Sequence, residues 1–381
     1  MAVEFIGYVA PNERSEIIAP RGPAVDRDWI ATVARAHEHV GFDRALVAYG
    51  SSSPDVLQIA AYAAHATSRL KFLLAHRPGF VFPTLAARQL ASLDHFSEGR
   101  IAVHIISGGS DVEQQRDGDY LGHDERYART DDYLDVVRKT WTGTAPFDHD
   151  GPHYRLKDNF SGVKPLQQQA GRPHVPIFFG GSSDAALRVA GKHADVYALW
   201  GESLDQVRET IAKVRAAAAP HGREHQVRFS LSLRPVIAPT EDAAWAKAQT
   251  ILERARSLAA QSPRGRQAPG QAPQNVGSQR LLETARRGKV VDTRLWTELA
   301  ALTGAAGNST ALVGTPEQVG ESLLAYRDLG ISHFLIRGFD PLPDALDYGR
   351  HLLPLVREEI ARREAGAARP APASNPAAVA A

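Results

Sequence analysis

The sequence contains no cysteine, so disulfides, thiolate catalysis and cysteine-bound metals are excluded. It also has no apolar stretch near the roughly 20 residues that a helix needs to cross a bilayer. The segment MAVEFIGYVAPNERSE lacks the charged start, apolar core and small-residue cleavage site of a signal peptide. The sequence also has no large net charge, because 44 basic residues balance 43 acidic ones. It therefore has no overall positive potential that would attract nucleic acid or an anionic membrane. We expect a cytoplasmic protein that binds neither.

Apolar, β-rich runs alternate with helical periodicity along most of the chain. The runs are nearly continuous in hydrophobicity, as in parallel strands that are buried on both faces. Eight of them in 381 residues favour a (β/α)8 barrel over a doubly wound sheet, and no GxGxxG follows the first run. The expected strands are 3–10, 44–49, 70–76, 100–109, 175–179, 196–199, 227–238 and 333–338. The expected helices include 28–42, 55–67, 83–96, 127–142 and 241–260, and a hairpin is expected at 147–154.

Two segments interrupt this alternation. Residues 261–281 are rich in Gly, Pro and Gln and have no periodicity, which in a compact domain indicates a functional lid or disorder. Residues 366–381 are rich in Ala and Pro, a composition typical of a disordered tail. We therefore expect one barrel domain over residues 1–365, with a lid insertion at about 261–308 between the later strands.

The predicted strand ends are polar and rich in glycine, and barrel enzymes place their active sites at such ends. No HExxH motif or spaced acidic cluster occurs there, so we predict no metal site. The segment GGSSDAAL follows a strand and opens a helix, where glycines and free amide groups suit a phosphate. The same residues fit a plain N-cap, with Ser182 or Ser183 as the capping residue. The late position in a barrel favours the phosphate.

Three basic residues in strand-like sequence allow two interpretations each. His76 ends the third strand beside Arg77 and is a site candidate, although an ordinary loop pair fits as well. His104 lies within a buried strand, where a satisfied core histidine is the simpler interpretation. Arg234 must find an anion, because an unpaired buried guanidinium is costly. That anion is either a substrate group or an internal carboxylate.

In their order along the chain, several segments resemble the flavin-dependent alkanesulfonate monooxygenases of the bacterial-luciferase-like superfamily. The resemblance covers most of the chain apart from the tail and implies a (β/α)8 barrel that uses reduced FMN from a separate NAD(P)H-dependent flavin reductase. With O2, such an enzyme breaks the C–S bond of a small anionic organosulfonate and releases sulfite and an aldehyde. By analogy the protein would be a homodimer or homotetramer. The segments are LKFLLAHRPGFVFPTLAARQLASLDHFSEGRIAVHIISGGSD, HDERYARTDDYLDVVRKTW, PIFFGGSSDAA, ADVYALWGE, NSTALVGTPEQV and ALDYGRHLLPLV.

The resemblance also implies roles for single residues. Ser182 and Ser183 match phosphate-binding serines, with Tyr127 nearby, and Ser107 would lie along the flavin. Trp200 matches a tryptophan of the substrate pocket. The full set of expected cofactor-binding residues is His76, Ser107, Tyr127, Gly180, Gly181, Ser182 and Ser183. The expected catalytic residues are Arg234, Trp200 and Ser53, and the expected substrate-binding residues are Trp200, Arg234, Tyr49, His333 and Arg337.

The sequence departs from the family pattern in the region of the anion pocket. Ser53 stands where the family has a cysteine, and Ser232 and Arg234 stand where it has an Arg-x-His. The lid arginine falls near Ala305, and a Tyr-Pro-His becomes Phe339-Asp340-Pro341. Arg234, His333 and Arg337 could supply the missing charge, although His333 fits equally the start of the last strand. These departures indicate a retained flavin site and a changed substrate, such as a larger or sugar-linked sulfonate.

Three other functions fit parts of the sequence. A flavin- or deazaflavin-dependent oxidoreductase of the same superfamily would act on a sulfone or a non-sulfur substrate. A flavin-storing relative without activity fits less well, because of the long insertion. A barrel aldolase or isomerase would need a lysine or carboxylate at the strand ends, where only Glu202 is found.

Overall fold

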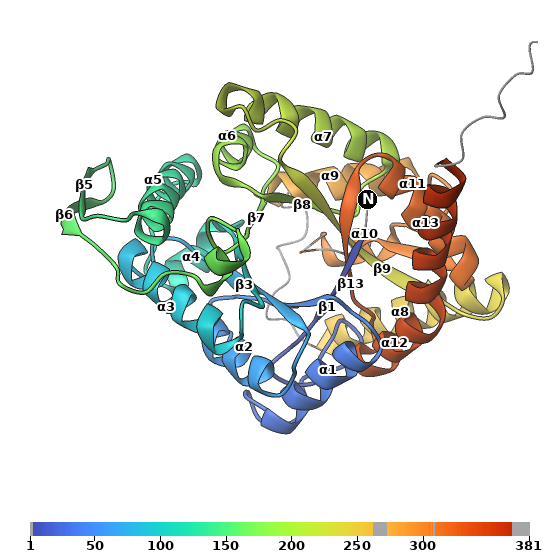
Figure 1. Cartoon of the computed structure of the whole chain (residues 1–381). Helices are drawn as coiled ribbons and strands as arrows, with labels where there is room; N and C mark the ends of the chain where they lie inside the picture. Colours follow the sequence, from blue (N-terminus) through green and yellow to red (C-terminus); the bar gives the residue numbers. More distant parts are fainter. Residues whose placement is uncertain (1–2, 262–272, 306, 308, 368–381) are drawn as a thin grey trace, which may run out of the picture.

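The computed structural model describes residues 3–261, 273–305, 307 and 309–367. Eight parallel strands form a closed barrel that helices surround (Figure 1), which confirms the predicted (β/α)8 fold. The strands follow one another around the barrel in chain order, and the barrel closes where β13 pairs with β1 and with β9. They are β1 (Glu4–Tyr8), β2 (Arg44–Val47), β3 (Lys71–His76), β4 (Ile101–Ile105), β7 (Ile177–Gly180), β8 (Val196–Trp200), β9 (Arg228–Ile237) and β13 (Ile331–Ile336).

Side chains along each strand alternate between the helix layer and the barrel interior. In β3, Phe72 and Leu74 pack outward in the large core between strands and helices. Leu73 points inward and joins a smaller apolar layer across the barrel, which includes Phe178 and Ile6. Both faces of the strands are therefore buried, which explains their continuous hydrophobicity.

The helices begin where the sequence supplies caps. Asp26 accepts a hydrogen bond from the Trp29 amide at the start of α1, and Thr315 caps α11 through the Gln318 amide. The helices are α1 (Arg27–His39), α2 (Val56–His65), α3 (Pro83–Phe96), α4 (Asp111–Arg116), α5 (His123–Thr142), α6 (Asp184–His193), α7 (Leu204–Ala218), α8 (Glu241–Gln261), α9 (Val276–Arg287), α10 (Glu298–Thr303), α11 (Pro316–Asp328), α12 (Pro341–Asp347) and α13 (Leu353–Ala367). Short 3-10 turns occupy Leu166–Ala170 and Ala219–His221, and a π-helical turn occupies Tyr348–Leu352. Within the described ranges, no helix combines the length and apolar composition that a membrane crossing requires.

One barrel strand continues into a second, smaller sheet. Beyond Leu233, β9 pairs with β12 (Ala311–Gly314), a short strand that the sequence analysis did not foresee. β12 is followed across the sheet by β11 (Leu295–Trp296) and β10 (Val290–Val291), both in the predicted lid insertion. The hairpin expected at 147–154 is present as β5 (Phe147–Asp150) and β6 (Arg155–Asn159).

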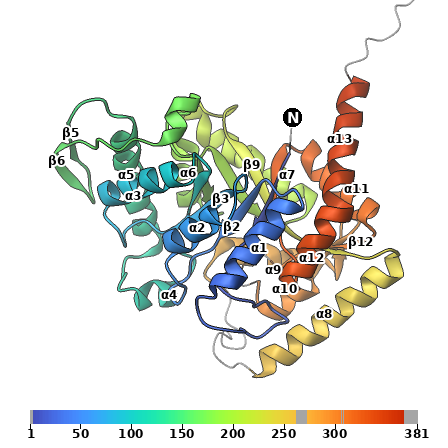
Figure 2. The ribbon, with the colours of Figure 1, turned by 60° about the horizontal axis from the view of Figure 1, so that its bottom comes forward.

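The predicted lid insertion is described in part. It contains α9 and α10, which lie with α4 at one end of the barrel (Figure 2), while residues 262–272, 306 and 308 lie outside the described residues. The predicted tail, 366–381, also lies outside them, except that its first two residues complete α13.

Candidate active site

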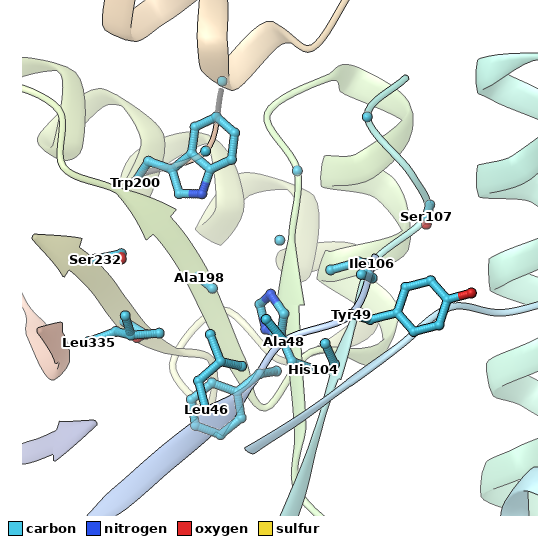
Figure 3. A pocket seen from close by; sticks show the side chains of 18 of the residues that line it. Leu46, Ala48, Tyr49, His104, Ile106, Ser107, Ala198, Trp200, Ser232 and Leu335 are labelled. Atoms are coloured by element: carbon cyan, nitrogen blue, oxygen red, sulfur yellow. The ribbon is translucent and has the colours of Figure 1, made fainter. Parts of the chain in front are cut away.

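A cavity of about 600 Å³ opens inside the barrel at the carboxyl-terminal ends of its strands. Its floor is apolar and contains Leu46, Leu73, Phe178 and Leu335. In Figure 3, Trp200, Ser232 and Leu335 lie along one side and Tyr49, Ile106 and Ser107 along the other, with His104 between them. This is the size and the end of the barrel at which barrel enzymes bind their ligands.

A charged layer closes the barrel below this floor. Glu4 lies 3.4 Å from Arg44, 3.3 Å from Lys71 and 3.8 Å from the His333 ring. His333 packs edge-on against Phe178, which separates it from the cavity. Burial lowers the pKa of His333 to about 4, so its ring is neutral at pH 7. The structure therefore places His333 at the opposite end of the barrel from the substrate-binding position expected for it.

A second cavity of about 270 Å³ adjoins the first at the N-terminus of α6. Ser182 lines both cavities, and Ser183 caps the helix by accepting a hydrogen bond from the Ala186 amide. Arg126 also lines the second cavity, where its Nη1 lies 2.9 Å from Asp111. The free amides and positive dipole of a helix start, two hydroxyls and a guanidinium form a set of donors that fits a phosphate group. The two interpretations of GGSSD are compatible, because Ser183 forms the cap while Ser182 faces both cavities.

Gly181 brings the backbone close to this helix start. It has a φ of +143°, and a Cβ on it would lie 2.6 Å from Tyr127 Oη and 2.7 Å from Ala186 Cβ. A side chain at this position would fill the space between the strand end and α6. Gly181 and Tyr127 line both cavities, while Gly180 lines the larger one, so three expected cofactor-binding residues surround the passage between them.

Of the two strand histidines, His104 lines the cavity and His76 does not, which is the reverse of what the sequence suggested. His76 points out of the barrel, where its Nε2 lies 2.7 Å from Tyr133 Oη, and it does not line the cavity. His104 does line the cavity, and its Nδ1 has no hydrogen-bond partner among the described residues. Burial lowers the pKa of His104 to about 4, which keeps the ring neutral. The strand alternation explains the difference, since Ala75 and Arg77, on either side of His76, face the cavity.

Arg234 is held by an internal ion pair instead of facing the cavity. Its side chain is 0% exposed, and its Nη1 lies 2.7 Å from Glu16 Oε2. Its Nη2 also donates to the Gly338 carbonyl, and its guanidinium lies over the Phe339 ring. Arg234 follows the inward-facing Ser232 by two residues, but from Arg234 onward β9 pairs with β12 and leaves the barrel wall. The anion that pairs with Arg234 is therefore a carboxylate of the protein, Glu16, and not a group of the substrate.

Arg337 is the guanidinium that faces the cavity on this side. It lines the cavity beside Tyr8, and its Nη2 lies 2.6 Å from Glu16 Oε1. Glu16 thus bridges Arg337 and Arg234. Burial alone would raise the pKa of Glu16, but the two arginines overcome it and lower the pKa to about 2. The bridge is consequently ionised at neutral pH and fixes the position of Arg337.

The opposite wall contains Tyr49 and two residues that the sequence analysis did not propose, Arg77 and Glu113. Tyr49 lines the cavity and donates a hydrogen bond of 2.9 Å to Asp117. Ser107 lines it as well and shares a hydrogen bond with Thr130. Ser53, the expected catalytic serine, is not among the lining residues, and its backbone amide donates to the Gly50 carbonyl in the turn after β2.

Helix α9 covers the side of the cavity where Trp200 lies. A Cβ on Gly277 would lie 3.1 Å from the Trp200 ring, so α9 approaches the indole closely at this glycine. Glu202, two residues after Trp200, is 3% exposed and binds Arg280 of α9 through both carboxylate oxygens, at 2.9 and 2.8 Å. Gln274, just before α9, joins the same segment to Asp111, the first residue of α4. The described part of the insertion is therefore attached at two points around the cavity.

Replacing Arg280 with lysine is expected to loosen this attachment. A lysine cannot form both hydrogen bonds to Glu202, and the loss of one is expected to cost about 1 kcal/mol. The amides of residues 276–287 should then exchange hydrogen about fivefold faster, while those of α5 stay unchanged. Arg286→Lys, at an exposed position of the same helix, is the control. Equal exchange in the two variants would show that the Glu202 pair does not hold α9.

A possible cation cluster lies outside the cavity. Asp131, Asp135 and His193 place one ligand atom each within 4.8 Å of one another, on α5 and α6. The Lys192 ammonium already lies 2.9 Å from Asp131 and 2.7 Å from Asp135. A side chain of the protein thus neutralises these carboxylates, and the cluster gives no support for a metal centre.

The comparison with protein families gives one match. The family model described as luciferase-like monooxygenase matches residues 6–333, which is most of the chain and runs from within β1 to within β13.

Similar folds occur in several solved structures. Riboflavin lyase (RcaE), solved with modified FMN and riboflavin, has a TM-score of 0.76 and 21% identity over 94% of this chain and 92% of its own. DmoA from Hyphomicrobium sulfonivorans has a TM-score of 0.75 and 20% identity over 94% and 89% of the two chains. EDTA monooxygenase (EmoA) from Chelativorans sp. BNC1 has a TM-score of 0.72 and 19% identity over 94% of both. At these identities, the comparison shows a shared fold.

Proposed function

Because the chain belongs to the luciferase-like monooxygenase family, we propose that it is a two-component monooxygenase that uses reduced FMN and O2 to break the C–S bond of an organosulfonate. One oxygen atom of O2 would enter the aldehyde and the other would form water, while sulfite leaves and the reduced flavin gives two electrons. The observation that carries the proposal is the pair of adjoining cavities, about 600 and 270 Å³, which meet at Gly181 and Ser182. The smaller fits a phosphate and the larger has room for a flavin ring and a substrate.

The residues around the smaller cavity would hold the FMN phosphate. Ser182, the amides at the start of α6 and Arg126 would donate to its oxygens, with Tyr127 between the two cavities. His104 offers an unpartnered Nδ1 in the wall of the larger cavity, where a neutral imidazole can accept or donate a hydrogen bond. This assigns to His104 the contact that the sequence suggested for His76.

The other residues of the larger cavity would bind the substrate and exclude water. When bound, reduced FMN would supply the electrons and the reactivity towards O2, so the protein need not supply a nucleophile. Arg337 would face the sulfonate, and Trp200 with α9 would cover the reacting carbon. A separate NAD(P)H-dependent flavin reductase would deliver the reduced FMN. We further expect the protein to form a homodimer or homotetramer in the cytoplasm.

A second candidate function follows from the state of Arg337. Its guanidinium already has a carboxylate partner, Glu16, so the cavity does not require an anionic ligand to balance it. This observation favours an oxidoreductase of the same family that acts on a sulfone or a non-sulfur substrate, with a flavin or a deazaflavin.

The release of sulfite from a panel of sulfonates tests the first proposal. The assay contains the protein, a flavin reductase, FMN, NADH and air, with simple alkanesulfonates, aromatic sulfonates and a sugar sulfonate. We expect sulfite from at least one member, and none when the reductase or O2 is omitted. If FMN binds tightly and no sulfonate releases sulfite, the proposal of C–S cleavage is wrong and the second candidate is favoured.

A further inference from the structure

The two arginines of the larger cavity belong to ion-pair clusters of opposite net charge. The first cluster contains Arg337, Arg234 and Glu16, so two guanidiniums share one carboxylate and the net charge is positive. The second contains Arg77, Glu113 and Asp117, where one guanidinium lies between two carboxylates and the net charge is negative. The cavity therefore has a positive and a negative wall.

The negative wall is built around Arg77, whose side chain is only 3% exposed. Its Nη2 lies 3.0 Å from Glu113 Oε1 and its Nη1 lies 3.7 Å from Asp117 Oδ2. Tyr49 stacks on the guanidinium at 4.5 Å and also donates to Asp117. The Nε and Nη1 atoms of Arg77 have no hydrogen-bond partner among the described residues, although both are buried. The guanidinium of Arg77 therefore serves to hold the two carboxylates in this wall.

Glu113 is the carboxylate of this wall that faces the cavity, and Asp117 adds the surplus negative charge from behind it. Glu113 lines the cavity from α4, whereas Asp117 does not, and its Oε1 also accepts a hydrogen bond from the Ser51 amide. Among the described lining residues, the only other acid or base that could carry charge near pH 7 is His104, which burial keeps neutral. A ligand that reaches this wall therefore meets the Glu113 carboxylate, with a second carboxylate, Asp117, behind it. That environment suits an uncharged hydrogen-bonding group or a cation, and it repels an anion.

The two walls are far enough apart to contact different ends of one molecule. Arg77 follows β3 and Arg337 follows β13, and β1 and β2 lie between these strands. Three strand spacings of about 4.8 Å put the walls roughly 14 Å apart around the barrel.

We propose that the cavity recognises an elongated organic monoanion by the charge of both its ends. The anionic head binds at Arg337, and the far end binds at the wall of Arg77 and Glu113, which accepts an uncharged or cationic group and excludes a second anion. Glu113 is thus a specificity-determining residue. This inference rests on the proposed organosulfonate activity and adds the substrate's charge pattern to it.

A series of matched sulfonates tests the proposal. Octane-1-sulfonate, an analogue that ends in a carboxamide and an analogue that ends in a carboxylate are compared by sulfite release and by equilibrium binding to the FMN-loaded enzyme. The proteins are the wild type, Glu113→Gln, which keeps the shape and removes the charge, and Glu113→Asp, which keeps the charge. Glu321→Gln, at an exposed position of α11, makes the same change of charge far from the cavity.

The wild type is expected to bind the carboxylate-ended analogue at least about tenfold more weakly than the carboxamide, because a like charge faces it. We call the ratio of the affinities for the carboxamide-ended and carboxylate-ended analogues the gap. Glu113→Gln should reduce this gap to about threefold or less, while Glu113→Asp and Glu321→Gln should keep it. The absence of a gap in the wild type, or an unchanged gap in Glu113→Gln, would overturn the proposal. So would a loss of FMN affinity in Glu113→Gln with the gap unchanged, because the wall would then serve the flavin.

The same experiment separates this inference from the proposed function. Binding with the expected difference in affinity, but without sulfite from these compounds or from the wider panel, would support the charge pattern and refute C–S cleavage. Sulfite from all three compounds at equal efficiency would support C–S cleavage and refute the charge pattern. If none of the three compounds binds, the charge pattern is refuted, and the wider panel of sulfonates decides on C–S cleavage.

Discussion

Replacing Ser182 with aspartate is expected to lower the affinity for FMN at least about a hundredfold, because a carboxylate would then face the phosphate and like charges in contact cost several kcal/mol. The affinity for riboflavin, which has no phosphate, should change only about threefold or less. Ser182 lines both cavities without forming the helix cap, so the exchange leaves the Ser183 hydrogen bond to Ala186 in place. The two affinities are measured by titration of the flavin fluorescence.

The control for this variant is Ser257→Asp, the same chemical change at an exposed position of α8. It should leave both affinities at the wild-type values. An equal loss of FMN and riboflavin affinity in Ser182→Asp would mean that the α6 start does not bind the phosphate, and it would remove the observation on which the flavin site depends.

The barrel could be predicted from the sequence because each of its strands is buried on both faces. Continuous apolar runs such as Phe72–Leu74 have no polar face, and that pattern is specific to parallel strands between helices and a filled interior. The sheet extension was missed for a related reason. β12 has four residues, and β10 and β11 have two each, so none is long enough to show a periodicity.

The proposed phosphate end of the site could also be predicted from the sequence, since Gly180–Ser183 is a contiguous strand-to-helix turn. The histidines show where such reasoning stops. Both lie near strand ends, but alternation places His104 inside the barrel and His76 outside it, and a shift of one residue in the assumed register exchanges them. Once Arg77 and Ala75 are assigned inward, the position of His76 follows, so the strand pattern contained a usable signal.

The charged walls could not be predicted in this way, because they join residues far apart in the chain. Glu16 lies in the loop after β1 and meets Arg234 and Arg337 only when β9 and β13 have paired around the barrel. The prediction that a buried Arg234 must pair with an anion is confirmed. Its partner could not be identified from the sequence, because the exit of β9 towards β12 decides which way the side chain points.

This arrangement predicts different defects for the two arginines that share Glu16. Arg337→Met should raise the apparent KM for a sulfonate substrate about a hundredfold and leave the FMN affinity and the urea midpoint close to wild type, since it removes a charged donor from the cavity. Arg234→Met should lower the free energy of unfolding by about 3 kcal/mol, because it removes a fully buried guanidinium from its ion pair with Glu16 and breaks two hydrogen bonds to carbonyls. The measurements are steady-state kinetics, flavin titration and urea unfolding on each variant.

Arg88→Met, at an exposed position of α3, controls for the loss of one positive charge and should behave as the wild type in all three measurements. The decisive comparison is between KM and stability within each variant. If Arg234→Met raised KM as steeply as Arg337→Met at unchanged stability, Arg234 would contribute to substrate binding by positioning Arg337 through Glu16. If the defects separate as expected, Arg234 and its ion pair serve the fold, and Arg337 is the arginine that binds the substrate.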